Sequence, residues 1–443
     1  MRLNPLLFAP LVIVFVRCVG DSTVTVPDAS DATMGSDVAQ AGDSTTDVSS
    51  DATDAALPPL AITPTLALGF GFSCVSQANG SVWCWGLNST GEFGNMATNT
   101  TNPNPVPGQV DNIMNAATIG AGAGFVCALA TDHTVWCWGQ NTLGQVGQAA
   151  STTPTLVPTQ VPGLTDVVQL AVGGNHVCAR KNDSSVWCWG DNAFDQLGYS
   201  NATDTLCGGT LCNPTPTKVA GLVAANIASG VVHTCAQVGT TAQCWGANGD
   251  AQLGHLPGQM GDLGTSPNYY NPTPNPAAAT GVDAIYAGGD VTCSISGSQA
   301  LSCWGSDNTG QLGDEGAAGA QTINPVIVTG VNPTTQAAPG FVNSCAVANS
   351  AVFCWGDNVG CEEGTNQDGG TDIGPSNVSG LNTGVVQVAS DMIGAHHCAL
   401  KDTGDVLCWG ENDHDELGHD NSTDRTCPGG AKGDSTPTLV AGL

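Results

Sequence analysis

Positive charge is the scarcest feature of this sequence. Its 443 residues include 8 Lys and Arg against 38 Asp and Glu, which gives a formal net charge of −30. Binding to DNA or RNA requires a basic surface that faces the phosphates, so the composition argues against a nucleic-acid partner. If the protein has a partner, this charge balance favours a basic one.

Long hydrophobic runs and sustained helical periodicity are also missing. The 59 Gly and 25 Pro are poor helix formers and favour turns between short strands. The apolar run at residues 6–16 follows Arg2 and is too short to span a bilayer, as in a secretory signal peptide. We therefore predict a signal peptide over residues 1–20 and an extracytoplasmic protein, either secreted or anchored to the surface or outer membrane.

Two processing routes for this signal peptide remain open. Cleavage after Gly20 would release a free chain that begins at Asp21. Lipidation of Cys18 would anchor the chain, although Arg17 stands where a lipoprotein signal has a small residue. We expect membrane contact only through the signal peptide or such a lipid anchor.

Residues 21–56 contain no aromatic and no basic residue. They are rich in Asp, Ser, Thr and Ala, and eight of them are Asp. Such a segment cannot bury enough apolar surface to offset the loss of chain entropy, so we predict a disordered linker.

The rest of the chain, residues 57–443, repeats itself. The tripeptide Cys-Trp-Gly occurs seven times, at intervals of 51 to 59 residues. Each repeat contains about four short β-type runs separated by Gly, Asn, Asp and Pro, and four strands in a period near 50 residues are typical of a propeller blade. We predict an all-β, seven-bladed β-propeller with four-stranded blades. The repeated tryptophans are Trp85, Trp138, Trp189, Trp245, Trp304, Trp355 and Trp409.

The repeat has the pattern Gly-x-x-His-x-Cys-Ala…Val-x-Cys-Trp-Gly-x-Asn-x-x-Gly-Gln-Leu-Gly…Pro-Thr-x-Val. This pattern resembles the repeat of the regulator of chromosome condensation (RCC1) family over nearly all of residues 57–443. The resemblance implies a seven-bladed propeller, here an exported, disulfide-rich member of bacterial type. Cys361 and Asp415 depart from the pattern by replacing the first Gly of the Gly-Gln-Leu-Gly turn, and only His176, His233 and His396 fill the histidine position.

The fixed places of the tryptophans and of the last Gly of that turn predict structural roles. We expect the indoles to pack in the core or between blades, with carbohydrate stacking as the alternative. The histidines belong to the same frame, so we expect them to be structural too. The turn glycines are Gly94, Gly147, Gly198, Gly254, Gly313, Gly364 and Gly418.

The first repeat lacks the Pro-Thr-x-Val segment that precedes the others, and the chain ends with such a segment at residues 436–443. We therefore predict that the C-terminal strand completes the blade begun by the N-terminal segment and so closes the ring.

Fourteen of the 19 cysteines form seven pairs inside the repeats. Each pair brackets a hairpin turn at a separation of 9 or 10, which places the two cysteines opposite each other on antiparallel strands, within reach of a disulfide. Buried reduced thiols remain the alternative, while zinc fits poorly because no Cys-x-x-Cys occurs. The pairs are Cys74 with Cys84, Cys127 with Cys137, Cys178 with Cys188, Cys235 with Cys244, Cys293 with Cys303, Cys345 with Cys354, and Cys398 with Cys408. We expect Cys207 to pair with Cys212, and Cys361 with Cys427 between the last two blades.

Catalytic and cofactor motifs are sparse. Asp413, Asp415 and Glu416 are candidates for a calcium site, and a solvated acidic loop is the alternative. The sequence has no Gly-x-Ser-x-Gly and no phosphate loop, so we predict no enzyme activity and no other cofactor. An unrecognised hydrolase is the remaining enzymatic alternative.

We predict a monomeric, extracytoplasmic propeller that binds a protein through variable loops between its strands, and the charge balance favours a basic partner. Two alternatives stay open: guanine-nucleotide exchange on a small GTPase, the activity of the founding family member, and inhibition of an enzyme by the secreted protein. The variable loops are residues 95–109, 199–216, 255–276, 314–325, 362–377 and 419–435.

Overall fold

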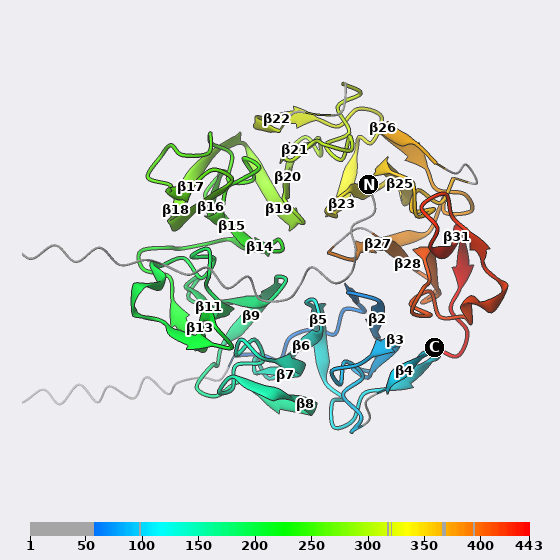
Figure 1. Ribbon diagram of the computed structural model, residues 1–443, viewed down its shortest axis with the longest axis horizontal. Helices are drawn as coiled ribbons and strands as arrows, with labels where there is room; N and C mark the ends of the chain where they lie inside the picture. Colours follow the sequence, from blue (N-terminus) through cyan, green and yellow to red (C-terminus); the bar gives the residue numbers. More distant parts are fainter. Residues whose placement is uncertain (1–56, 97–98, 317–318, 320, 366–368, 393–394) are drawn as a thin grey trace, which may run out of the picture. The chain divides into compact units, whose positions relative to one another are not determined.

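Seven antiparallel β-sheets, each built from one repeat, follow one another around a ring (Figure 1). The computed structural model describes residues 57–443 apart from 97–98, 317–318, 320, 366–368 and 393–394. The predicted signal peptide 1–20, with Cys18, and the predicted linker 21–56 lie outside the described residues. The seven-bladed propeller predicted from the repeats is confirmed.

Each blade uses four consecutive strands, ordered from the central channel outwards. Blades 1 and 2 consist of β1 (Leu66–Gly69), β2 (Phe72–Ser76), β3 (Val82–Asn88) and β4 (Asn99–Gln109), then β5 (Ala116–Ala121), β6 (Phe125–Ala130), β7 (Val135–Asn141) and β8 (Ser151–Gln160). Blade 5 consists of β19 (Val282–Gly288), β20 (Val291–Ser296), β21 (Leu301–Gly305) and β22 (Thr322–Ile327), and blade 6 of β23 (Thr334–Pro339), β24 (Asn343–Ala348), β25 (Ala351–Asp357) and β26 (Thr371–Asn377).

Blades 3, 4 and 7 add a short fifth strand at the outer edge. Blade 3 has β9 (Val167–Val172), β10 (His176–Lys181), β11 (Val186–Asp191), β13 (Thr210–Lys218) and the edge strand β12 (Thr205–Cys207). Blade 4 has β14 (Asn226–Ser229), β15 (His233–Val238), β16 (Thr241–Ala247), β18 (Asn268–Thr280) and β17 (Leu263–Thr265). Blade 7 has β27 (Val385–Ser390), β28 (His396–Lys401), β29 (Val406–Glu411), β31 (Lys432–Leu439) and β30 (Arg425–Thr426). One-turn 3-10 helices, η1 (Asn201–Thr203) and η2 (Asn421–Thr423), lie in the loops of blades 3 and 7.

The predicted ring closure is wrong. The C-terminal strand β31 pairs with β29 of its own blade, and blade 1 takes its fourth strand, β4, from its own repeat. The Pro-Thr-x-Val segment therefore completes the preceding Cys-Trp-Gly strand and does not begin the next repeat. Side chains join blade 7 to blade 1: the Gln387 amide accepts a hydrogen bond from Leu66 N at 2.9 Å, as Gln336 does from Val388 N between blades 6 and 7.

The repeated tryptophans bind each blade to the one before it. Every one of the seven indoles is fully buried, and its Nε1 donates to a main-chain carbonyl in the Gly-Gln-Leu-Gly turn of the preceding blade. The acceptors for Trp85, Trp138, Trp189, Trp245, Trp304, Trp355 and Trp409 are Glu416, Glu92, Gln145, Gln196, Gln252, Gln311 and Glu362, at 2.7–3.1 Å. The same hydrogen bond is present between blades 7 and 1. The junction that closes the ring is therefore built like the other six junctions between blades.

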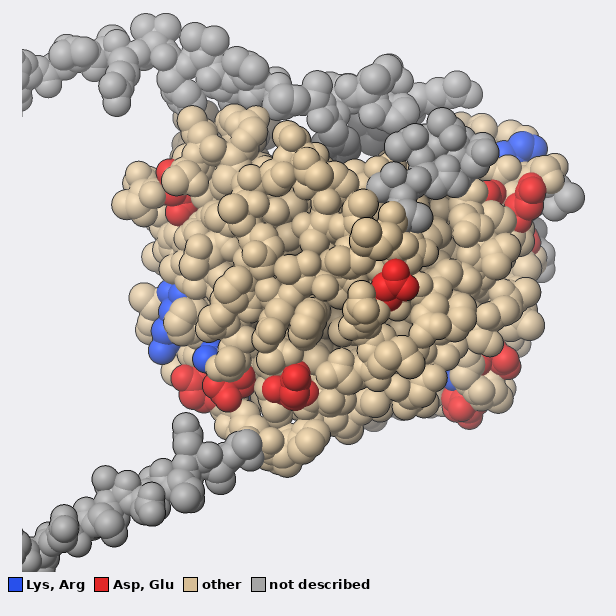
Figure 2. Space-filling view, turned by 90° about the horizontal axis from the view of Figure 1, so that it is seen from below, with Lys and Arg blue, Asp and Glu red and all other residues tan. Residues whose placement is uncertain are grey.

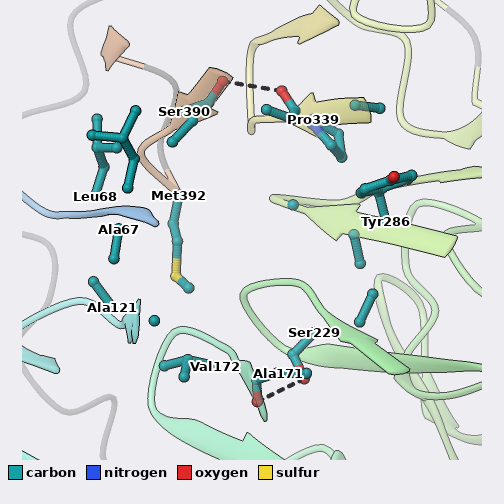
Figure 3. A pocket seen from close by; sticks show the side chains of 18 of the residues that line it. Ala67, Leu68, Ala121, Ala171, Val172, Ser229, Tyr286, Pro339, Ser390 and Met392 are labelled. Carbon is teal, nitrogen blue, oxygen red and sulfur yellow. Dashed lines mark hydrogen bonds between the residues drawn. The ribbon is translucent and has the colours of Figure 1, made fainter. Parts of the chain in front are cut away.

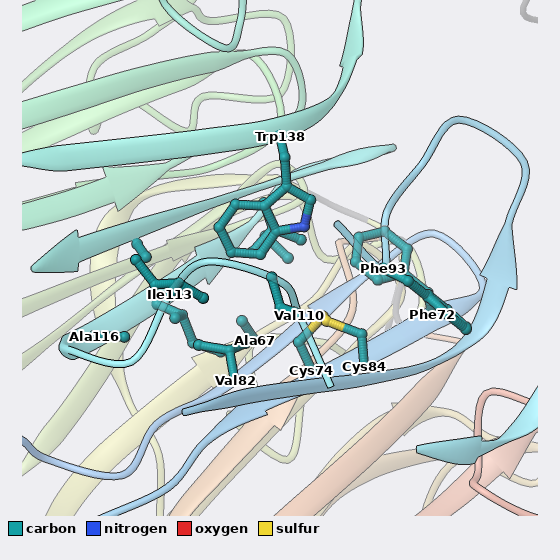
Figure 4. Close-up of a cluster of buried hydrophobic side chains, with 14 residues drawn as sticks. Ala67, Phe72, Cys74, Val82, Cys84, Phe93, Val110, Ile113, Ala116 and Trp138 are labelled. Atoms are coloured by element: carbon teal, nitrogen blue, oxygen red, sulfur yellow. A yellow bond between two sulfur atoms is a disulfide. The ribbon is translucent and has the colours of Figure 1, made fainter. Parts of the chain in front are cut away.

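The indoles also fill the apolar space between blades. Figure 4 shows Trp138 of blade 2 packed among blade 1 residues, beside Val110 and the Cys74–Cys84 disulfide. This placement supports the packing role of the tryptophans and leaves no exposed indole face for stacking on a sugar at these positions.

Nine disulfides join the cysteine pairs that the spacing predicts, so the alternative of buried reduced thiols is not what the structure shows. Seven of them link the second and third strands of a blade, where the two cysteines face each other in register. These seven join Cys74 with Cys84, Cys127 with Cys137, Cys178 with Cys188, Cys235 with Cys244, Cys293 with Cys303, Cys345 with Cys354, and Cys398 with Cys408.

The other two disulfides lie outside the hairpins. Cys207 is bonded to Cys212 and links β12 to β13, while Cys361 is bonded to Cys427 and links the loops of blades 6 and 7. All eighteen bonded cysteines are at least nine-tenths buried. The predicted bridge between the last two blades is therefore present in the structure.

In blades 3 and 4 the histidine position makes a polar contact with the next blade. His176 Nε2 lies 2.8 Å from Thr234 Oγ1, and His233 Nε2 lies 2.9 Å from Thr292 Oγ1. In blade 1 the same position is Phe72, and the residue of blade 2 equivalent to Thr234 is Val126. The polar pair and the apolar pair are thus interchangeable, which supports a structural role for these histidines.

We expect these histidines to make the protein less stable in acid. Burial lowers the pKa of His176 and of His233 from 6.5 to about 3. The unfolded chain therefore takes up the proton first as the pH falls from 6.5 towards 3, and the free energy of unfolding decreases over that range. The variant His176→Phe with Thr234→Val, which copies the blade 1 pair, should lose part of this pH dependence.

Urea unfolding at pH 7.5 and at pH 4.5 measures the effect. The comparison of the double variant with the parent cancels the titration of the many carboxylates, which both proteins share. An unchanged difference between the two pH values would contradict a neutral buried His176.

The last glycine of each turn is required by both conformation and space. Gly313 has φ +70°, and an added Cβ would lie 2.6 Å from Trp355 Nε1. Gly330 in the same blade has φ +78° with nothing within 4 Å of an added Cβ. We expect Gly313→Ala to lower the free energy of unfolding by about 2–4 kcal/mol, against about 1 kcal/mol for Gly330→Ala, in urea titrations. If the two variants lost equal stability, contact with the Trp355 indole would not be the reason that glycine is needed at position 313.

Candidate protein-binding face

The antiparallel order of the strands gives the propeller two different faces. One face, which we call the loop face, carries the turn between the first and second strands of each blade and the loop between its third and fourth strands. The opposite face, which we call the hairpin face, carries the tight hairpins between second and third strands and the connections to the next blade.

All six predicted variable loops fall on the loop face, but their predicted bounds are too wide. The C-terminal part of each is strand: β4, β13, β18, β22, β26 and β31 begin inside them. Prolines such as Pro103 and Pro105 made these segments look like loops in the sequence. They are compatible with strand here because an outer strand tolerates residues that cannot donate a hydrogen bond to a neighbouring strand. The loops proper are the shorter segments that precede these strands.

No charged side chain is found among the described residues that line the channel at the centre of the ring. The channel holds a cavity of about 320 Å³ lined by the innermost strands of all seven blades, which contribute mostly Ala, Leu, Val, Ile, Ser and Gln. Figure 3 shows the Met392 side chain of blade 7 projecting into this space, with Tyr286 on the opposite side. Small and apolar linings of this kind suit an apolar side chain better than an ion.

A ring of turn residues surrounds the mouth of the channel on the loop face. Main-chain hydrogen bonds connect its members from blade to blade: Phe70 N to Ala123 O, Ala123 N to Gly174 O, Gly174 N to Val231 O and Val231 N to Gly289 O, at 2.9–3.3 Å. Phe341 holds the same place in blade 6 and packs over Gly289. None of these six residues is charged, and the two phenylalanines are 40% and 38% exposed.

A second ring lies outside the first, at the residue that follows each Trp-Gly. The main-chain N–H of this residue donates to the carbonyl of the first turn in every blade. Its members are Leu87, Gln140, Asp191, Ala247, Ser306, Asp357 and Glu411. Charge therefore enters this ring in blades 3, 6 and 7.

The Gln of the Gly-Gln-Leu-Gly turn is replaced by Glu in three adjoining blades. In every blade this side chain accepts a hydrogen bond from the main-chain N–H two residues earlier. A carboxylate can accept that bond as well as an amide oxygen, so the fold permits the exchange. The glutamates are Glu92, Glu362 and Glu416, in blades 1, 6 and 7.

Two carboxylates from neighbouring blades approach each other at the junction of blades 6 and 7. Glu362 Oε1 and Glu411 Oε1 lie 2.6 Å and 2.9 Å from the position that a Cβ on Gly360 would take. Glu362 is 5% exposed, and Glu411 is partly exposed. Burial, with further contributions from Asp413, Glu416 and other neighbours, raises the pKa of Glu411 to about 7, and burial raises the pKa of Glu362 well above its usual value.

The three calcium candidates do not converge. Asp413 Oδ1 accepts from Lys432 N at 2.8 Å, Asp415 Oδ1 from Asn421 N at 3.0 Å, and Glu416 Oε2 from His414 N at 2.6 Å. Within the described part of the chain, no three His, Cys, Asp or Glu side chains gather in a way that could hold a metal ion. These carboxylates instead fix the loop that leads to β31.

Negative charge is distributed unevenly around the ring. Fifteen of the thirty acidic residues of 57–443 lie in 350–443, the segment of blades 6 and 7. Figure 2 shows a side of the molecule on which Asp, Glu, Lys and Arg are few and scattered. Acidic residues are therefore most concentrated in blades 6 and 7, while the described residues around the mouth of the channel are uncharged.

Comparison with known proteins identifies the repeat. A family model described as the RCC1-like domain matches residues 32–391, and one for the regulator of chromosome condensation (RCC1) repeat matches residues 394–416. The chain belongs to the RCC1-like domain family. Members with 25–27% identity include the human E3 ubiquitin-protein ligase HERC2 (26% over 395 residues) and the ultraviolet-B receptor UVR8 of Arabidopsis thaliana (27% over 321 residues).

The extent of these matches differs. The match to HERC2 covers 84% of this chain but 7% of HERC2. The match to UVR8 covers 70% of this chain and 68% of UVR8. Human WBSCR16 has a similar structure, with a TM-score of 0.66, 20% identity and coverage of 82% of this chain and 94% of that one. Prp20p of Saccharomyces cerevisiae was studied for its binding to Gsp1p and histones. Its structure matches with a TM-score of 0.65 at 20% identity, over 83% of this chain and 87% of Prp20p. These structures establish the fold of this family member.

No helix in the described residues is both long and apolar enough to cross a membrane.

Proposed function

We propose that this RCC1-like propeller is a non-enzymatic, extracytoplasmic protein that binds another protein through its loop face. The observation that carries the proposal is the segregation of sequence variation: the blade frame repeats, while all the variable loops emerge on one face around an uncharged channel mouth. A rigid scaffold that presents variable loops on one side is the usual arrangement of a recognition surface.

The disulfides support an extracytoplasmic location. Nine disulfides in one chain are expected in an oxidising compartment and are rare in the cytosol. They agree with the predicted signal peptide 1–20, which lies outside the described residues.

The start of the described chain lies on the side away from the loops. Leu60 N donates to Thr131 O, in the hairpin between β6 and β7, and Thr63 N donates to Ala117 O of β5. A linker that precedes Leu60 would thus attach at the hairpin face.

Guanine-nucleotide exchange is the second candidate, because Prp20p is a relative in fold. An exported chain could not reach a cytosolic GTPase, which makes this candidate dependent on the absence of export. Inhibition of an enzyme by the loop face is a special case of the first proposal.

Site-specific photocrosslinking in cells that produce the protein tests the proposal. A photoreactive residue in place of Phe341 on the loop face should give a discrete crosslinked product. The matched position is Val223, which is 64% exposed on the hairpin face, and it should not give that product. The same product from both positions, or from Val223 alone, would contradict a loop-face partner.

A further inference from the structure

We propose that the central channel is a binding site for a small, uncharged and mainly apolar molecule that carries a hydrogen-bond acceptor, and that the Tyr286 hydroxyl donates to this acceptor. This inference goes beyond the proposed function, because it concerns the inside of the ring and holds whether or not the loop face binds a protein.

The channel has the size and the lining of a small-molecule site. Its cavity of about 320 Å³ lies at the lower end of the range of about 300–1,000 Å³ that is usual for ligand pockets. The described residues that line it carry no charge and are mostly Ala, Leu, Val and Ile, so a charged ligand would lose its hydration there without gaining a counter-ion. The lining therefore favours an uncharged and mainly apolar ligand.

Five of the six polar side chains that line the cavity in the described part of the chain already bond to the main chain of an adjacent blade. They are Gln169, Ser229, Gln336, Gln387 and Ser390. In the Gln336 amide, for example, Nε2 donates to Val388 O and Oε1 accepts from Val388 N, both at 2.9 Å. These groups hold neighbouring blades together and are engaged before any ligand arrives.

Tyr286 is the sixth polar side chain of the lining. Its hydroxyl has no hydrogen-bond partner among the described residues, and its oxygen is not fully enclosed by protein atoms. Burial raises the pKa of Tyr286, so the hydroxyl keeps its proton at neutral pH and acts as a donor. A buried tyrosine usually finds a partner for its hydroxyl, and a ligand acceptor in the cavity would supply one here.

Only blade 5 has a large side chain at the position of Tyr286, which faces the first cysteine of the blade in register. The equivalent residues are Ala67, Gly120, Ala171, Ala228, Ala338 and Ala389. Figure 3 shows Tyr286 on the blade 5 side of the cavity, between Pro339 of blade 6 and Ser229 of blade 4. Its ring packs against the apolar cluster between blades 5 and 6, which accounts for the ring but not for the hydroxyl.

The test is titration of the oxidised protein with benzophenone, an uncharged probe with two apolar rings and one carbonyl acceptor, by isothermal titration calorimetry. Diphenylmethane has the same two rings without the carbonyl, and 2-benzoylbenzoate adds a carboxylate. We expect benzophenone to bind at one site, about three- to tenfold more tightly than diphenylmethane and about tenfold more tightly than 2-benzoylbenzoate.

Tyr286→Phe removes the hydroxyl and keeps the ring. It should weaken the binding of benzophenone by about three- to tenfold and leave the binding of diphenylmethane unchanged, which also shows that the variant is folded. Tyr269→Phe is the matched control. Tyr269 lies on the outer strand β18, its hydroxyl also lacks a partner among the described residues, and its loss should change neither affinity. Absence of binding, equal affinities of the parent protein for benzophenone and diphenylmethane, or an unchanged affinity for benzophenone in Tyr286→Phe would overturn the inference.

Photochemistry of the bound probe locates the site independently of affinity. On irradiation the benzophenone carbonyl oxygen takes a hydrogen atom from a nearby C–H bond, and the two carbon radicals that remain join in a covalent adduct. Adducts mapped by mass spectrometry to the innermost strands, β19 and β23 among them, support the inference. Adducts confined to the outer surface of the blades overturn it and leave the proposed function in place.

Discussion

Trp85→Ala should lower the free energy of unfolding by about 3–5 kcal/mol, the range for removing a large buried aromatic side chain. The indole is fully buried between blades 7 and 1, and its Nε1 donates to Glu416 O at 2.8 Å. The substitution leaves a cavity at the seam of the ring and removes one of the two hydrogen bonds that Glu416 O accepts, the other coming from Ser73 Oγ at 3.0 Å. Urea unfolding followed by the remaining tryptophan fluorescence measures the loss.

Trp189→Ala is the matched control, because it removes the same contact between blades 2 and 3. If the seam is built like the other junctions, the two variants lose similar stability. A much smaller loss of stability for Trp85→Ala would contradict ring closure by side-chain packing. It would favour closure by a C-terminal strand that pairs with the first blade.

Reduction of all nine disulfides should unfold the propeller at room temperature. Each repeat disulfide closes a loop of about ten residues, which the chain-entropy model values at about 2–3 kcal/mol. The sum over seven such bonds, about 14–21 kcal/mol, matches or exceeds the upper end of the roughly 5–15 kcal/mol by which single domains are usually stable. Circular dichroism of the protein with and without a strong reductant gives the answer, with the oxidised protein in alkylating agent as control.

Removing one disulfide should cause a proportionally smaller loss of stability. Cys178→Ser with Cys188→Ser should cost about 2–3 kcal/mol in urea titrations under oxidising conditions. A reduced protein that keeps its native circular dichroism spectrum would mean that blade packing alone holds the ring.

Local spacing was sufficient to predict the blades and the pairing of the cysteines. Cys178 and Cys188 bracket a tight turn, so their partners follow from the antiparallel register of one hairpin. The tryptophan at a fixed place in each repeat indicated packing for a similar reason. These features depend on residues close together in the chain.

The order of strands at the ring closure could not be found in this way. The Pro-Thr-x-Val segment lies between two repeats, and spacing alone does not decide which blade it joins. The turn also holds more exceptions than the sequence pattern indicated: Asp195 and Ala251, like Cys361 and Asp415, have φ near +60° to +70° at its first position. Asp and Asn adopt this conformation more readily than other residues with a Cβ, and Ala251 does so at some cost in strain.

The candidate site was the least accessible to sequence reasoning. Glu362 and Glu411 come from different repeats and meet only because blades 6 and 7 are neighbours. The sequence instead suggested a site at Asp413, Asp415 and Glu416, whose carboxylates accept hydrogen bonds from main-chain N–H groups of their own loop. The substitution of Glu for Gln in the turns of blades 1, 6 and 7 was the available signal for this concentration of acidic residues.

The intact mass of the protein from its native source, alkylated with and without prior reduction, tests the account most directly. We predict a chain shortened at its N-terminus, or lipidated at Cys18, that takes up no alkyl group until it is reduced. After reduction it should take up eighteen on the cysteines of residues 57–443, which form the nine disulfides. A full-length chain whose thiols alkylate without reduction would contradict an exported, disulfide-stabilised binding protein and would favour exchange on a cytosolic GTPase.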